Sequence, residues 1–299
     1  MSSINQERIA FIGGGNMAEA IIGGLIANKY APQCITVFDP SEERQVELHK
    51  KYGITVAPDG NSAIYGVEEN GDHSAEIVVL AVKPQVLKQV AFGLSKAIRT
   101  VQPLVVSIAA GIRTQSMERW LLTGNEDGNL SDSDDEAKIS IVRCMPNTPA
   151  LVLCGASGMY ANRNVSASQK ESADKVMSAV SKTEWVEKED LLDAVTAVSG
   201  SGPAYFFLVL EAMEKAGVEA GLSAETASAL AIQTCLGAAK MAADSDDSVA
   251  ELRRKVTSPN GTTDAAIKTM IKGDVPKWVS NGVIAADKKS KELAKELGN

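Results

Sequence analysis

The feature that most constrains the fold is a glycine turn near the N-terminus, between an apolar run and a helix-like stretch. The segment reads Arg8-Ile9-Ala10-Phe11-Ile12-Gly13-Gly14-Gly15-Asn16-Met17-Ala18. Its spacing fits the pattern G-x-G-x-x-G/A, with Gly13, Gly15 and Ala18 at the three small positions. There the first glycine permits a tight turn, the second lets the backbone approach a pyrophosphate, and the third residue keeps the helix close to the strand. The segment therefore predicts a dinucleotide-binding α/β fold.

The segments that follow support this prediction. A second strand-like run, residues 35–38, leads into Asp39, where dinucleotide sites of this type carry an acidic residue that bonds a ribose hydroxyl. Further strand-like runs lie at residues 54–56, 76–81, 103–108, 138–143 and 183–187, and helical patterns alternate with them. Continuously apolar runs are typical of a parallel sheet covered on both faces. We expect the loops beyond the carboxyl ends of these strands, residues 81–84, 109–111 and 144–149, to lie beside the cofactor.

The character of the chain changes near residue 188. From Glu189 onward only helical patterns are present, and Pro203 should kink or break the apolar stretch 191–220. The predicted fold class is therefore α/β, with a Rossmann-type doubly wound parallel sheet in residues 1–188 and an all-α helical domain in residues 189–299.

An apolar run in the helical half predicts self-association. Residues 205–210, Tyr-Phe-Phe-Leu-Val-Leu, have no polar face, and a helix that is apolar all round is buried on all sides. A helical domain of this length would struggle to cover it alone, so we expect a homodimer with intertwined helices. The alternative is a helix buried within its own chain.

Composition excludes several classes of function. The formal net charge of −8 argues against nucleic acid or an anionic membrane surface as a partner. No uninterrupted apolar run reaches 18 residues, and the nearest candidate contains Asp193, so no membrane span is expected. The four cysteines form no C-x-x-C pair, which predicts no metal and reduced thiols in the cytoplasm. The acidic, glycine- and serine-rich stretch 124–136 is typical of a mobile surface insertion.

Two turns in the helical half concentrate small residues and hydroxyl groups, at residues 199–205 and 256–263. The second turn opens a helix, with Thr262 as the expected N-cap, and a helix N-terminus binds carboxylates as it binds phosphates. The only histidines, His49 and His73, lie among polar residues that indicate surface positions. Acid–base chemistry based on histidine therefore has few candidates.

Taken in order, these motifs resemble the pyrroline-5-carboxylate reductase family over nearly the whole chain. The resemblance rests on residues 11–18, Ala81-Val82-Lys83-Pro84, residues 106–111, Arg143-Cys144-Met145-Pro146-Asn147-Thr148-Pro149, and residues 199–205, 237–241 and 256–263. Several motifs in the right order are more specific than any one of them. The resemblance implies reduction of a cyclic imine to L-proline by hydride transfer from NADPH or NADH, the last step of proline synthesis.

The resemblance also implies roles for individual residues. A protonated imine is already electrophilic, so the enzyme mainly has to hold the ring against the nicotinamide. The substrate carboxylate would be held by Ser258 and the N–H groups of Gly261 and Thr262. The Thr263 hydroxyl would bond the ring nitrogen and orient or supply its proton, and Asp246 stands where relatives often carry an acidic residue. The cofactor contacts carried over are Gly13, Gly15, Asn16, Met17, Asp39, Asn61, Ala81, Val82, Lys83, Pro84, Ala109, Ala110, Gly111 and Asn147.

Two departures from the family pattern matter. Asp39 stands where many relatives have a small hydroxyl residue that accepts a 2′-phosphate, and a carboxylate favours a ribose 2′-hydroxyl instead. Arg44 in the next helix would partly compensate, so the choice between NADPH and NADH stays open. The second departure is Asn260 in place of glycine, and asparagine tolerates the positive φ that the turn requires.

Two other readings stay open. β-Hydroxyacid dehydrogenases share the architecture, but their lysine in a G-x-G-x-x-x-K pattern corresponds to Phe206 here. A sensor or scaffold that binds NAD(P)H without turnover would not need the second anion site at residues 258–263. The resemblance leaves assembly beyond a dimer open, since some relatives form rings of dimers.

Overall fold

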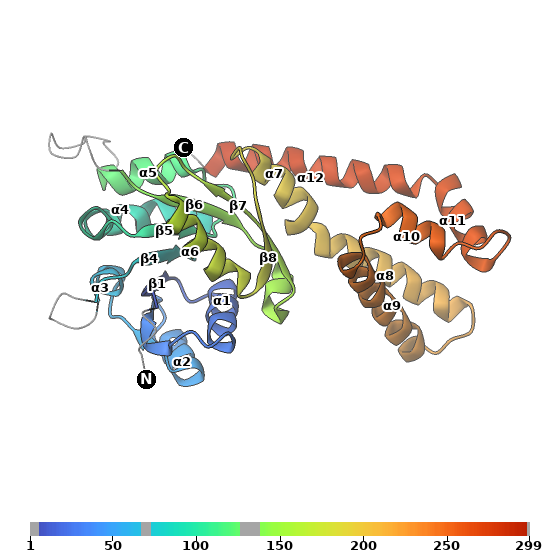
Figure 1. The fold of residues 1–299 in the computed structure, drawn as a ribbon, viewed down its shortest axis with the longest axis horizontal. Coiled ribbons are helices and arrows are strands. Elements are labelled where there is room, and N and C mark those ends of the chain that lie inside the picture. Colours follow the sequence, from blue (N-terminus) through green and yellow to red (C-terminus); the bar gives the residue numbers. More distant parts are fainter. Residues whose placement is uncertain (1–5, 67–72, 126–137, 298–299) are drawn as a thin grey trace. The chain divides into compact units, whose positions relative to one another are not determined.

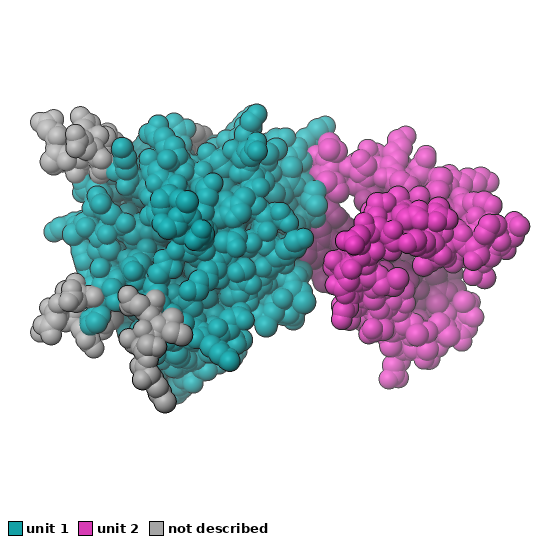
Figure 2. Space-filling view, viewed as in Figure 1, with its two compact units in different colours: residues 1–200, 287–299 teal, residues 201–286 magenta. Residues whose placement is uncertain are grey.

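The chain is described from a computed structural model, which covers residues 6–66, 73–125 and 138–297. Most of the predicted insertion, residues 126–136, lies outside the described residues. The fold divides into two compact units, residues 1–200 with 287–299 and residues 201–286, which Figure 2 colours separately. Each unit is described by itself below. The predicted domain boundary at residue 188 stays a prediction.

Unit 1 is built on one sheet with strands in the order β3-β2-β1-β4-β5-β6-β7-β8 (Figure 1). Strands β1 to β6 are parallel to one another, β7 runs antiparallel to β6, and β8 is parallel to β7. The strands are β1 (Ile9–Ile12), β2 (Ile35–Phe38), β3 (Thr55–Val56), β4 (Ile77–Leu80), β5 (Leu104–Ser107), β6 (Ile141–Met145), β7 (Gly155–Ala161) and β8 (Ser181–Trp185). The predicted Rossmann-type sheet dominated by parallel strands is thus confirmed.

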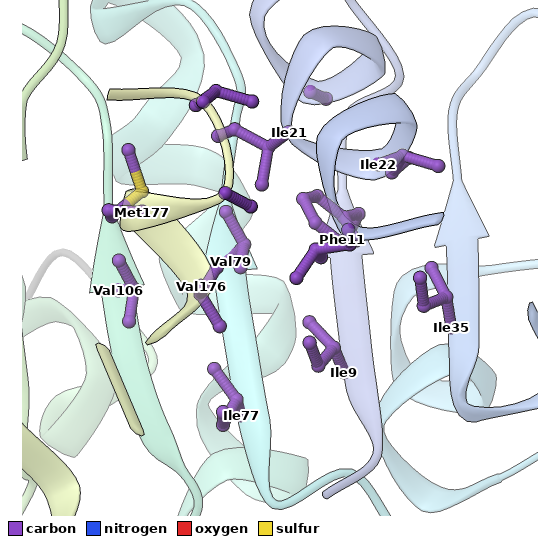
Figure 3. Packing of buried hydrophobic residues seen from close by; sticks show 14 of the residues in the cluster. Ile9, Phe11, Ile21, Ile22, Ile35, Ile77, Val79, Val106, Val176 and Met177 are labelled. Atoms are coloured by element: carbon purple, nitrogen blue, oxygen red, sulfur yellow. The ribbon is translucent and has the colours of Figure 1, made fainter. Parts of the chain in front are cut away.

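Helices cover both faces of this sheet. They are α1 (Asn16–Ala27), α2 (Glu42–Tyr52), α3 (Gly60–Tyr65), α4 (Pro84–Val101), α5 (Thr114–Thr123), α6 (Ala167–Ser178) and α7 (Leu191–Val195), joined by the end of α12 (Val275–Leu297). Alternate residues of a strand point to opposite faces. In β1, Ile9 and Phe11 therefore pack with Ile21 and Ile22 of α1 (Figure 3), whereas Ala10 and Ile12 pack with the cluster under α3, α4 and α5.

One strand was absent from the sequence prediction, and two others are shifted. Strand β6 begins three residues after the start of the predicted run 138–143. Strand β7, Gly-Ala-Ser-Gly-Met-Tyr-Ala, is rich in small residues of low strand propensity, which hides it in the sequence. The structure explains its glycines, because a Cβ on Gly158 would lie 2.5 Å from Val195 Cγ1 and one on Gly155 would lie 2.9 Å from the Val180 carbonyl oxygen. Strand β8 begins two residues before the predicted run at residue 183.

Unit 2 is all helical, as predicted for this part of the chain. It contains α8 (Gly202–Glu219), α9 (Ala224–Asp244), α10 (Val249–Lys255), α11 (Thr262–Lys272) and the first part of α12. The predicted break at Pro203 is present, since a π-helical turn over Thr196–Gly200 ends unit 1 and Pro203 lies in the first turn of α8. By length and composition alone, the stretch Leu191–Glu219 would also suffice to cross a membrane. The absence of a membrane span therefore stays a prediction.

Candidate functional site

The glycine turn after β1 adopts the conformation that its sequence predicts. Gly13 has φ 101°, a value that disfavours side chains, and its N–H donates to the Phe38 carbonyl oxygen at 2.8 Å. A Cβ at Gly13 would lie 2.7 Å from the carbonyl oxygen of Ala81 and 3.1 Å from Val82 Cγ1. The turn is therefore pressed against the loop that follows β4, and only glycine fits there.

The N-terminus of α1 is open and has no side-chain cap. Gly15 is its N-cap, and no side chain accepts hydrogen bonds from the first turn. A Cβ on Gly15 would meet no atom within 4 Å, and both Gly15 and Asn16 are exposed. The unpaired N–H groups of the first turn and the helix dipole therefore face open space, which fits a pyrophosphate.

The sheet brings the other predicted cofactor loops to the same edge. Ile12 pairs in register with Phe38 and Leu80, and Leu80 pairs with Ser107, so these strands end side by side. Beyond those ends lie the half-buried Ala81, Val82 and Pro84, the exposed Lys83 and Ala110, the buried Ala109, and Gly111 with φ 78°. The half-buried Asn61 lies in the first turn of α3, a helix that packs beside β1 and β2.

Asn147 differs from the other predicted cofactor residues because its side-chain amide forms hydrogen bonds within unit 1. Its Oδ1 accepts from the Ala156 N–H at 2.8 Å, and its Nδ2 donates to the Ser199 carbonyl oxygen at 3.0 Å. The side chain thus ties the end of β6 to β7 and to the π-helical turn. This arrangement gives Asn147 a role in positioning the loop, with one amide hydrogen left over.

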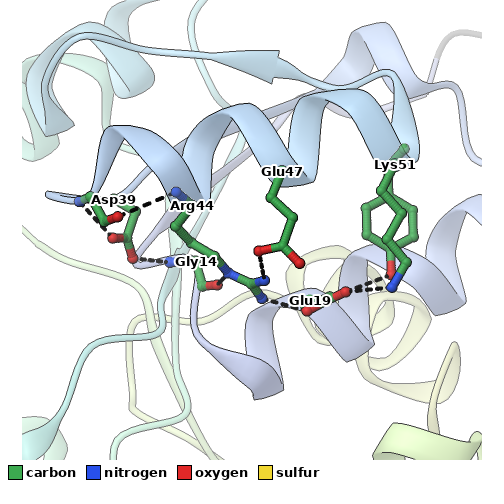
Figure 4. Close-up of polar contacts among 8 residues, drawn as sticks. Gly14, Glu19, Asp39, Arg44, Glu47 and Lys51 are labelled. Atoms are coloured by element: carbon green, nitrogen blue, oxygen red, sulfur yellow. Dashed lines mark hydrogen bonds and ion pairs between the residues drawn. The ribbon is translucent and has the colours of Figure 1, made fainter.

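The end of β2 carries Asp39, with both carboxylate oxygens oriented by the backbone. Oδ2 accepts from the Gly14 N–H at 2.8 Å, and Oδ1 accepts from the Ser41 N–H at 2.9 Å. Each oxygen keeps lone pairs for a further donor. The nearby Arg44 of α2 points toward α1, where it contacts the Gly14 carbonyl oxygen and Glu19, and it also contacts Glu47 of its own helix (Figure 4).

Glu19 is the common partner of several groups on α2. It forms an ion pair with Arg44, a second one with Lys51 at 2.7 Å, and accepts from the Tyr52 hydroxyl at 3.2 Å. The hydrogen bonds from Lys51 and Arg44 lower the pKa of Glu19 to about 2, so its carboxylate is ionised at any pH near neutrality. Sequence reasoning missed this residue; its signal was an acidic residue in the first turn of α1.

The predicted carboxylate site lies in unit 2, at the turn before α11. Asn260 has φ 60°, so the prediction that asparagine tolerates this turn is confirmed. The prediction that Thr262 caps the helix is wrong. Gly261 is the N-cap, with no side-chain cap bond, and Thr262 is the first helical residue. The reason is that the extended backbone of an N-cap falls at Gly261, at φ −84° and ψ 176°.

Within this turn the candidate donors are not equivalent. The Gly261 N–H already donates to the Ser258 carbonyl oxygen at 3.0 Å, which leaves Thr262 and Thr263 in the first turn of α11. Ser258 is exposed, Thr263 is half-buried, and Asp246 is exposed in the turn between α9 and α10. The Asp264 carboxylate accepts from the Asn260 N–H at 3.1 Å and from Lys268 Nζ at 2.7 Å, so Lys268 balances its charge.

A buried ion pair in the middle of β6 also escaped the sequence analysis. Arg143 Nη1 lies 3.2 Å from Glu189 Oε1, and the same carboxylate accepts from the Thr114 N–H at 2.7 Å and hydroxyl at 2.9 Å. The network joins β6, α5 and the entry to α7. All its members pair with one another, so we assign it to fixing the fold.

Comparisons with known proteins agree along the whole chain. Residues 189–293 match the family model described as pyrroline-5-carboxylate reductase dimerisation, and residues 8–111 match NADP oxidoreductase coenzyme F420-dependent. The pyrroline-5-carboxylate reductase of Pseudomonas aeruginosa is 47% identical over 97% of this chain and 98% of its own length.

Solved structures give the same result. A pyrroline-5-carboxylate reductase from Coxiella burnetii is 40% identical, with a TM-score of 0.86 over 97% of this chain and 99% of its own. A pyrroline carboxylate reductase from Plasmodium falciparum, solved with NADP bound, is 27% identical, with a TM-score of 0.77 over 98% of this chain and 100% of its own.

Proposed function

The chain belongs to the pyrroline-5-carboxylate reductase family, and on this premise we propose how its residues carry out the reaction. It reduces pyrroline-5-carboxylate to L-proline with NAD(P)H, in proline biosynthesis. The observation that carries this conclusion is identity of 47% to one such enzyme over nearly the full length of both chains. Neither the sensor nor the β-hydroxyacid dehydrogenase alternative is favoured by the relatives found.

The bound cofactor supplies a hydride. For its binding we propose the open first turn of α1, where Asn16 and Met17 contact the pyrophosphate through backbone N–H groups, and where Gly13 and Gly15 let the backbone approach it closely. Asp39 accepts the ribose hydroxyl of the adenosine, and Asn61 approaches the adenosine. The remaining proposed contacts, along the strand ends toward the nicotinamide, are Ala81, Val82, Lys83, Pro84, Ala109, Ala110, Gly111 and Asn147.

For substrate binding we propose the N-terminus of α11. Ser258 and the Thr262 N–H hold the carboxylate, with Gly261 providing the close approach of the backbone. The Thr263 hydroxyl bonds the ring nitrogen and fixes the face of the ring that receives the hydride. The nitrogen of the protonated imine keeps its proton as the carbon–nitrogen double bond is reduced, so no histidine is needed. Asp246 is the weakest candidate, because its assignment rests on the resemblance alone.

The steady-state oxidation of NADH and NADPH with pyrroline-5-carboxylate tests this proposal, for the wild type and Thr263→Ala. Misplacement of a reacting group by about 1 Å can cost about 10²-fold in rate, and we expect a kcat loss of about that size when the hydroxyl that orients the ring is removed. Thr262→Ala is the matched control, because it removes a neighbouring hydroxyl and keeps the backbone N–H. Equal losses in both variants would contradict the Thr263 role, and binding of both cofactors without turnover would contradict the reductase assignment.

The chain self-associates, in keeping with its match to the dimerisation model. We propose that the unit of assembly is a homodimer formed by unit 2, and that dimers assemble further into a ring, which the mass measured by sedimentation tests. We also propose a cytoplasmic location and no membrane partner. The four cysteines, all without disulfides, support this location.

A further inference from the structure

The position that distinguishes NADPH from NADH lies at the end of β2. In folds of this type, an acidic residue there bonds the ribose 2′-hydroxyl, whereas a nearby arginine accommodates a 2′-phosphate. This chain has both residues, Asp39 and Arg44, and the sequence alone does not decide between them. The contacts of the arginine therefore determine which chemistry the site offers.

All three side-chain nitrogens of Arg44 already have hydrogen-bond or ion-pair partners within the protein. Nε donates to the Gly14 carbonyl oxygen at 2.6 Å, Nη1 donates to Glu47 Oε2 at 2.7 Å, and Nη2 is paired with Glu19 (Figure 4). Its side chain is only 19% exposed. The aliphatic part of the Arg44 side chain lies over Gly14. A Cβ added to Gly14 would lie 3.5 Å from Arg44 Cγ and 2.9 Å from Leu48 Cδ1. The middle glycine of the turn thus makes room for this arrangement.

The charges around Arg44 balance without a phosphate. Arg44 and Lys51 are offset by Glu19 and Glu47, and both cations share the Glu19 carboxylate. Asp39 then adds a further negative charge beside the Gly14 N–H, and among the described residues it forms no ion pair. A phosphate dianion at this position would meet that carboxylate and would have to draw Arg44 away from two others.

We propose that Glu19 is a specificity-determining residue, which holds Arg44 on α1 and thereby makes this chain prefer NADH to NADPH. The proposal rests on the proposed cofactor site at the glycine turn. Glu19 acts through Arg44 and does not touch the cofactor, so it is a positioning residue. The arginine that follows β2 here completes the fold of the turn and does not serve as a phosphate receptor.

Titration calorimetry with NAD⁺ and NADP⁺ tests the proposal without turnover. We expect the wild type to bind NAD⁺ at least about tenfold more tightly, which corresponds to about 1.4 kcal/mol. Glu19→Gln keeps the size of the side chain and removes its charge, so NADP⁺ binding should tighten by about tenfold while NAD⁺ binding changes little. In an Arg44→Ala background the same Glu19→Gln change should have no effect on the preference.

Lys51→Gln is the matched control, because it removes the other cation from Glu19 and leaves Arg44 in place. Its ratio of NADP⁺ to NAD⁺ affinity should equal that of the wild type. The proposal is overturned if the wild type binds NADP⁺ as tightly as NAD⁺, or if Glu19→Gln shifts the ratio equally with and without Arg44. Turnover of pyrroline-5-carboxylate is measured separately, so an enzyme that binds both dinucleotides but reduces nothing refutes the proposed function and not the preference.

Discussion

The two units of this chain bury their apolar side chains in different ways. Unit 1 buries large residues throughout, including Phe11 and Trp120, on both faces of its sheet. In residues 201–286, all of which the structure describes, the buried apolar residues apart from glycine are two alanines, Ala227 and Ala231. Phe206, Phe207 and Leu208 of α8 are all more than 60% exposed. One unit therefore carries its own core, whereas the other leaves its large apolar side chains exposed in the single chain, in keeping with the match to the dimerisation model.

The largest loss of stability should come from a substitution in the core of unit 1. Phe11→Ala removes an aromatic ring that is fully buried between β1 and α1, which we expect to cost about 3–5 kcal/mol of unfolding free energy. Chemical denaturation at two protein concentrations measures it. Since the lost contacts lie within one chain, the cost should be the same at both concentrations, and a marked dependence on concentration would contradict a self-contained core.

Phe207→Ala makes the same chemical change in the other unit. The ring is 66% exposed in the single chain, so little packing within the chain is lost. If it is a central contact of the dimer, its removal weakens association by about 2–4 kcal/mol, or roughly 30- to 1,000-fold in the dimer dissociation constant. Sedimentation over a dilution series measures this constant. Binding of NAD⁺ by the variant serves as the control for an intact unit 1, and an unchanged dissociation constant would place the interface elsewhere.

A smaller loss of stability should follow from removing the hydrogen bond that joins the end of α12 to the rest of unit 1. Ser290 donates to the buried carboxylate of Asp193 at 2.7 Å. Ser290→Ala leaves that carboxylate without this donor, which we expect to cost about 1–3 kcal/mol in denaturation experiments. The matched control is Ser280→Ala, at an exposed position of the same helix, which should cost almost nothing. Equal losses from both variants would show that helix propensity, and not the hydrogen bond, sets the cost.

Sequence reasoning predicted the features that depend on neighbouring residues and missed those that depend on contacts between distant elements. Periodicity and the glycine pattern predict elements whose side chains act locally, such as β1, the turn at Gly13 and the kink at Pro203. They miss β7, whose glycines are explained only by their approach to Val195 and Val180. They also miss the partners of Arg44, because Glu19 lies on another helix and its contact depends on how α1 and α2 pack. The Thr262 prediction failed by one residue, the usual precision of a helix boundary.

The discontinuity of unit 1 has a consequence for how the chain is made. A protein emerges from the ribosome N-terminus first, yet this unit includes residues 287–299, which emerge only after the whole of unit 2. Until they emerge, Asp193 lacks its partner Ser290, and Gly111 lacks the side chain of Leu297, which otherwise lies near it. A nascent chain that has not yet reached residue 287 therefore presents unit 1 without these two contacts.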